Sequence, residues 1–164
     1  MSEFEQNLSR AKQYLTRFKE APLGQFIGGE FYTNEKTFTN LTPVDNTSIG
    51  EVSEGTEMDM DKACEAAKKA FPAWRDMPGA ERKRILHHFA DKIVERADEI
   101  ALVESMDCGQ PIRFMKQAAI RGAANFRFFA DKAPEAANGL SLHQEDHTNF
   151  TVRSPIGPVG IITP

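Results

Sequence analysis

The sequence has little cysteine, little tryptophan and no long apolar run, and each shortage excludes a class of protein. Its 164 residues include one tryptophan and two cysteines, Cys64 and Cys108, with no CxxC pair. A disulfide scaffold is therefore excluded, and we expect both thiols to be reduced. No apolar stretch approaches the roughly 20 residues that a membrane-spanning helix needs. The opening residues, Met1 to Gln6, are polar and acidic, so we expect a cytoplasmic chain with no targeting segment and no membrane partner.

An excess of positive charge is also missing. Lys and Arg number 20 against 24 Asp and Glu, a net charge of -4, so the chain has no global field to attract nucleic acid. The basic cluster of residues 82–88 has no interleaved aromatic residues, and we interpret it as the solvated side of a helix. The segment His143 to His147 carries metal-capable side chains but lacks the spacing and further ligands of a metal site.

The first half of the chain predicts one helix followed by short strands. Residues 2–20 place apolar side chains at helical spacing, with Ser2 as the N-cap. The pair Gly28-Gly29 predicts a tight hairpin turn, since both positions then need positive φ angles. Two further strands are predicted over residues 38–41 and 48–52.

From Met58 the apolar period changes to 3.6 residues, which predicts helices. We expect Pro72 to interrupt the first of them. The next runs from Pro78-Gly79 until Gly109, a residue that commonly ends helices. Another helix and two short strands are predicted over residues 112–133, 140–142 and 150–153.

The last eight residues, Gly157 to Pro164, are a continuous apolar run between glycine and proline signals, and they predict a buried strand of a parallel sheet. Such a strand needs partner strands and crossover helices. We therefore expect the chain to be the front of a larger, truncated α/β protein. A complete small α+β binding or adaptor module without catalytic activity is the alternative.

The helix over residues 112–133 has a second face that is unusual for a solvated surface. Two phenylalanines flank an arginine there, in the set Phe114, Gln117, Arg121, Asn125 and Phe128. Arg121 either faces a pocket, where it can pair a carboxylate through two hydrogen bonds, or covers apolar surface as an ordinary structural arginine. Spacing alone leaves both interpretations open.

Several strings together resemble the N-terminal third of NAD(P)-dependent aldehyde dehydrogenases. They are Phe26 to Phe31, Thr42 to Asn46 with Ile49 to Val52, Ala66 to Trp74, Arg82 to Phe89, Glu104 to Pro111 and, most specific, Pro155 to Pro164. The resemblance implies the N-terminal part of that α/β fold. It divides the chain into an N-terminal helical extension (1–22), part of the cofactor-binding domain (23–137), strands of an oligomerisation arm (138–157) and the first strand of a Rossmann-like core (158–164).

The resemblance also implies site residues. Ile162, Thr163 and Pro164 match positions that line the nicotinamide side of an NAD or NADP cleft. A monovalent-cation site seen in many members corresponds to Asn40, Leu41 and Asp107, although Cys108 replaces the more usual Thr or Asn beside the aspartate. By the same resemblance neither Cys64 nor Cys108 is the nucleophile, and the full-length protein is a homo-oligomer.

Within the family, Asn125 to Ala130 is similar to the hydroxymuconic semialdehyde dehydrogenases of aromatic degradation. Arg121 then falls where members present an arginine to the substrate, with Gln117 beside it. A fixed guanidinium there orients the carboxylate of an anionic semialdehyde. The resemblance therefore implies an oxidoreductase that converts such a semialdehyde to the acid with NAD(P).

Residues 1–164 alone are expected to have no dehydrogenase activity, because by this resemblance the catalytic Asn, Cys and Glu lie beyond Pro164. The measurement is the absorbance of reduced cofactor after NAD and a semialdehyde are added to the purified chain. Turnover above a heat-inactivated sample would contradict the expectation.

Overall fold

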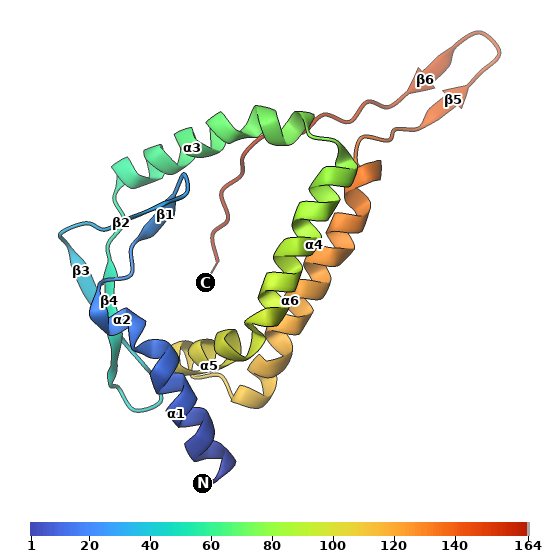
Figure 1. Ribbon diagram of the computed structural model, residues 1–164. Coiled ribbons are helices and arrows are strands. Elements are labelled where there is room, and N and C mark those ends of the chain that lie inside the picture. Colours follow the sequence, from blue (N-terminus) through green and yellow to red (C-terminus); the bar gives the residue numbers. More distant parts are fainter. Residues whose placement is uncertain (164) are drawn as a thin grey trace.

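The computed structural model describes residues 1–163, and its elements follow the predicted order of helix, strands, helices and hairpin (Figure 1). The helices are α1 (Glu3–Leu15), α2 (Arg17–Glu20), α3 (Glu57–Asp76), α4 (Gly79–Glu95), α5 (Ala97–Cys108), α6 (Ile112–Lys132) and the 3-10 turn η1 (Ala133–Glu135). The strands are β1 (Gln25–Ile27), β2 (Glu30–Tyr32), β3 (Thr37–Leu41), β4 (Ser48–Ser53), β5 (Ser141–His143) and β6 (Thr148–Phe150).

The N-terminal helix begins at its predicted cap but is divided. The Ser2 hydroxyl accepts from the amide of Glu5, whose carboxylate accepts from the Ser2 amide in return, which is a capping box. The single helix predicted over 2–20 is wrong at Thr16. There the side-chain hydroxyl donates to the Lys12 carbonyl at 3.0 Å, and α1 ends.

The strands form separate two-stranded antiparallel hairpins rather than one sheet. Gly28 and Gly29 link β1 to β2 with φ of 63° and 97°, which confirms the predicted turn. Strand β3 pairs with β4, and its register shifts between Asn40 and Leu41. This irregularity lies beside the predicted cation site.

Two predicted helix boundaries are wrong. Pro72 does not interrupt α3, which continues to Asp76. The guanidinium of Arg82 donates to the carbonyls of Trp74, Arg75 and Met77, so that α4 supplies the donors that the last turn of α3 lacks. The helix predicted over 78–109 breaks at Arg96, whose φ and ψ of -107° and 13° are not helical, and α5 then starts in a new direction.

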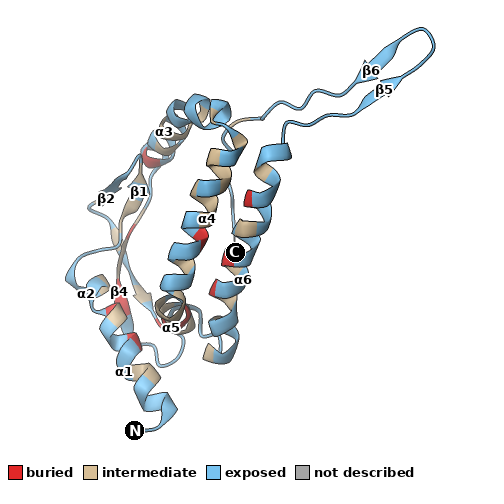
Figure 2. Cartoon of the chain, turned by 45° about the vertical axis from the view of Figure 1, so that its right-hand side comes forward, coloured by how far each residue is buried: buried red, intermediate tan, exposed pale blue. Residues whose placement is uncertain are grey.

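The centre of the molecule is the packing of α4 along α6, with α5 against the same end of the pair (Figures 1 and 2). The buried positions on these helices are nearly all alanines, which let the backbones approach closely; they are Ala90, Ala101, Leu102, Ala119, Ala123 and Ala130. The buried alanines of α6, Ala119, Ala123 and Ala130, thus fix one face of the helix in the core.

The end of the described chain differs from the sequence prediction. Residues 151–163 form no strand, and the Ile162 side chain is 100% exposed. The predicted strand is not formed within the described residues, because none of the strands over 1–163 pairs with this segment. Its place in a larger parallel sheet stays a prediction. Strands β5 and β6 project from the body as an isolated hairpin, with Ser141 opposite Phe150 (Figure 1).

Among residues 1–163, none of the helices has both the length and the apolar character required to cross a membrane.

Acid should remove one defined source of stability at the start of α3. Asp59, only 5% exposed, accepts hydrogen bonds from the Asn34 amide at 2.7 Å and from the Thr56 hydroxyl and backbone amide at 2.8 and 2.9 Å. These bonds lower its pKa from 3.8 to about 2. Because the folded pKa lies below the unfolded one, the stabilisation is present above about pH 4 and is lost as pH falls toward 2.

Asp59→Asn should therefore be less stable than the wild type at pH 7 and should lose less stability between pH 5 and pH 2. The measurement is the urea midpoint across this range. Asp61→Asn, an exposed neighbour on α3, is the control and should follow the wild type. Parallel curves for the wild type and Asp59→Asn would contradict the assignment.

Candidate functional site

The outer face of α6 carries the residues predicted to meet the substrate. Because alanines hold the inner face against α4, Phe114, Gln117, Arg121, Asn125 and Phe128 all remain exposed. This confirms the two-faced character of the helix. It does not decide what the outer face contacts.

Arg121 differs from most arginines of the chain in having no partner among residues 1–163. Arg127, on the same helix, donates to Asp91 at 2.6 Å, and Arg96 forms two hydrogen bonds with Glu99 at 2.8 and 2.9 Å. The Arg121 side chain takes part in none of the hydrogen bonds or ion pairs between side chains of the described residues. Its five N–H donors are therefore available to an anion.

The structure brings together two of the three predicted cation-site residues. The Asn40 amide nitrogen donates to the Asp107 carboxylate at 2.6 Å, which joins β3 to the last turn of α5 across 67 positions of sequence. Leu41 follows at the shifted register of β3 and has an exposed side chain. A pocket of about 150 Å³ beside this contact is lined by Asn40, Asp107 and seven other residues.

A residue that sequence reasoning missed holds this site together. Thr42 is buried; its hydroxyl donates to the Met106 carbonyl and accepts from the Val44 amide at 3.3 Å. It thereby fixes the β3–β4 loop to α5, one residue from Asp107. No local pattern in the sequence indicates this role, and only the non-local partner of Thr42 reveals it.

The donor chemistry of this site suits a hard cation. Asp107 supplies carboxylate oxygen, and Asn40 keeps its amide oxygen as an acceptor, the oxygen ligands that hard cations take. Among residues 1–163, no three or more His, Cys, Asp or Glu side chains gather as they would around a transition metal.

The segment predicted to line the cofactor is exposed. Val159, Ile161 and Ile162 present apolar side chains in an irregular stretch. Such side chains fit one apolar wall of a nicotinamide site, while residues 159–163 offer no positive charge for phosphate groups. Thr163 is also exposed, and Pro164 lies outside the described residues.

The remaining polar clusters have structural partners. Lys83 and His87 of the basic cluster both contact Asp131 of α6, at 2.9 and 2.8 Å. The His87 hydrogen bond, followed by that of Lys83, holds the Asp131 pKa below its ordinary value. Cys64 and Cys108 are free and exposed, and the Cys108 thiol contacts the Glu104 carbonyl at 2.9 Å.

Comparison with solved structures supports the fold. HpcC from Thermus thermophilus superposes with a TM-score of 0.90 and 38% identity, over 96% of this chain and 31% of that one. PnpE in complex with nicotinamide adenine dinucleotide superposes with a TM-score of 0.76 and 34% identity, over 83% of this chain and 28% of that one. The predicted fold class, part of the α/β aldehyde dehydrogenase fold, is confirmed.

Comparison of sequences gives the same result. The 2-hydroxymuconic semialdehyde dehydrogenase of Pseudomonas sp. (strain CF600) is 36% identical over an alignment 147 residues long, which covers 85% of this chain and 30% of that protein. The chain spans about 30% of the length of the curated relatives that it matches. Residues 31–164 match the Aldehyde dehydrogenase family, and the chain therefore belongs to this family.

Proposed function

We propose that the complete protein oxidises an anionic semialdehyde of the hydroxymuconate type to the carboxylic acid, with NAD(P) as the hydride acceptor. Family membership supports the reaction, and the unpartnered Arg121 on the outer face of α6 supports the anionic substrate. The alternative of a non-catalytic module has less support, since residues 31–164 match a family of enzymes.

In this proposal Arg121 positions the substrate. Its guanidinium forms paired hydrogen bonds to a substrate carboxylate, and the amide of Gln117, one turn earlier on α6, adds a further polar contact. Phe114 and Phe128 limit the mobility of the bound carbon chain from either side. The rigid contact of α6 with α4 then fixes the direction in which the aldehyde group points.

When NAD(P) is bound, its nicotinamide ring is the hydride acceptor. Solved relatives of the fold hold NAD, PnpE among them, which supports this choice. We infer that Ile162 and Thr163, with Pro164, form one wall beside the nicotinamide ring. The exposed surfaces of Ile162 and Thr163 are available for that contact.

We also infer a homo-oligomer. An isolated two-stranded hairpin is only marginally stable in water, and β5–β6 exposes Leu142 and Phe150. Pairing of this hairpin with further strands of another subunit would satisfy its open edges.

Arg121→Ala in the complete protein should reduce kcat/KM for a carboxylated semialdehyde while barely changing that for a neutral aldehyde of similar length. Loss of a charge-assisted contact to a carboxylate costs about 2 to 3 kcal/mol, or roughly 30- to 150-fold. Arg121→Lys keeps the charge without the planar fork and should give an intermediate value. The measurement is steady-state NADH formation with both substrates.

Equal losses on both substrates would return Arg121 to a structural role. Absence of NAD(P)-dependent oxidation of any aldehyde by the wild type would instead contradict the proposed reaction, so the two failures are distinguishable.

The Asn40–Asp107 site is proposed to hold a monovalent cation. Potassium or sodium should then raise the melting temperature of the wild type relative to tetramethylammonium at equal ionic strength, because a ligand bound only by the folded state stabilises it. Asp107→Asn should abolish the difference. Glu104→Gln, an exposed neighbour on α5, is the control and should retain it. Equal melting temperatures of the wild type in all three salts would contradict the proposal.

A further inference from the structure

A second concave site lies between α1, α5 and the start of α6. Its volume is about 630 Å³, within the roughly 300 to 1,000 Å³ of small-molecule sites. We call this site the α1–α6 groove. Most of the residues that line it are apolar, namely Phe4, Leu8, Ala11, Val44, Leu102, Met106 and Ile112. Two of these remain largely exposed, Phe4 at 71% and Val44 at 58%.

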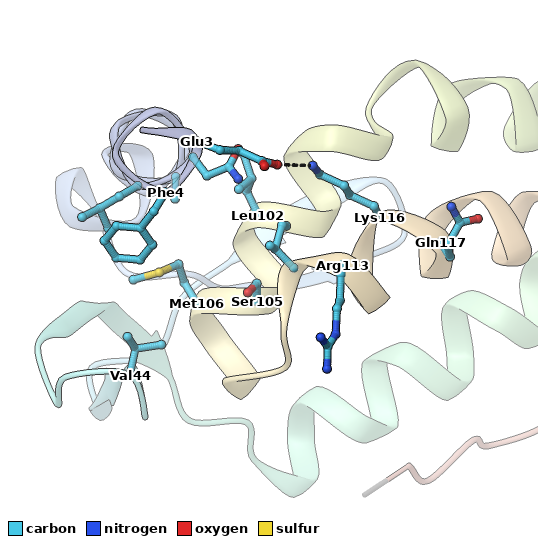
Figure 3. Close-up of a pocket in the computed structure, with 13 residues that line it drawn as sticks. Glu3, Phe4, Val44, Leu102, Ser105, Met106, Arg113, Lys116 and Gln117 are labelled. Carbon is cyan, nitrogen blue, oxygen red and sulfur yellow. Dashed lines mark hydrogen bonds and ion pairs between the residues drawn. The ribbon is translucent and has the colours of Figure 1, made fainter. Parts of the chain in front are cut away.

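Ion pairs fix α1 as one wall of this groove. Arg10 of α1 pairs with Asp98 of α5, and Arg17, just beyond α1, pairs with Glu99. At the α6 side, Lys116 contacts the Glu3 carboxylate at 3.2 Å (Figure 3). The single acidic group of the lining, Glu3, is thereby already matched by a cation.

The other charged group of the groove has no acidic partner. Figure 3 shows the Arg113 side chain extending away from the Glu3–Lys116 pair. Its guanidinium lies 4.7 Å from the centre of the Phe114 ring, which restricts its orientation, and Arg113 forms no ion pair with residues 1–163. The groove therefore combines an apolar surface with one preoriented, unmatched positive charge.

We propose that the α1–α6 groove binds a small amphipathic carboxylate, with its apolar chain against Phe4, Leu102 and Met106 and its carboxylate on Arg113. Charge complementarity selects this ligand class: the lining carries two cations and one anion, and burial of an uncharged chain would leave Arg113 unmatched. Gln117 lines this groove and also belongs to the proposed substrate face, so the two sites adjoin. The present proposal rests on Arg113 and does not depend on the contact of Arg121 with substrate.

Octanoate is the probe, and octanamide, which has the same chain without the charge, is its comparison. Isothermal titration of the complete protein should give about tenfold tighter binding of octanoate than of octanamide. In Arg113→Gln the two affinities should become equal. Val44→Glu places a carboxylate in the groove lining and should weaken octanoate more than octanamide.

Arg153→Gln is the matched control, because Arg153 is also exposed and unpaired among residues 1–163 but does not line the groove. It should retain the wild-type preference. Absence of octanoate binding to the wild type, equal affinity for the two probes, or an unchanged preference in Arg113→Gln would overturn the proposal. Circular dichroism of each variant checks that the helices are retained.

Discussion

The close contact between α4 and α6 is the constraint on which the rest of the structure depends. Both helices present alanines to each other, and Ala90, Ala123 and Ala130 are completely buried. Small side chains contribute little apolar area individually, but they allow the backbones to approach and fix the rotation of each helix about its axis. The rotation of α6 decides that Arg121 is exposed, so the proposed substrate face follows from packing on the opposite side of the helix.

Arginine pairing separates structural from candidate functional side chains in this molecule. Arg82 completes the end of α3, Arg10 and Arg17 hold the N-terminal region to α5, and Arg127 joins α6 to α4. Arg113 and Arg121 lie on α6 without such partners among residues 1–163. The composition of the chain does not distinguish paired from unpaired arginines. Only their three-dimensional contacts do so.

Local sequence patterns predicted most of the helices and strands. They did not predict features that depend on contacts between residues far apart in the sequence. The positive φ angles of Gly28 and Gly29, the Ser2 cap and the two faces of α6 follow from short-range rules, and each is observed. The end of α3 is capped by Arg82 of α4, which donates to the carbonyls of Trp74, Arg75 and Met77, and the Asn40–Asp107 contact joins segments 67 residues apart. The division into four parts, the cofactor wall and the roles of Gln117, Arg121 and Leu41 stay predictions.

The strand predicted at the end of the chain is not formed for a related reason, since a buried strand requires neighbours and residues 1–163 supply none to it. Another contact, between the start of α4 and η1, joins two segments earlier in the chain. Gly79 at the start of α4 lies against the backbone of η1, where a Cβ would be 2.6 Å from the Pro134 Cα. The start of α4 and the 3-10 turn η1 after α6 are therefore in contact, so that α4, α5 and α6 form a three-helix unit whose two ends meet. The β5–β6 hairpin begins only after this contact. The hairpin can therefore change in length or sequence during evolution while the three-helix unit behind it keeps its geometry.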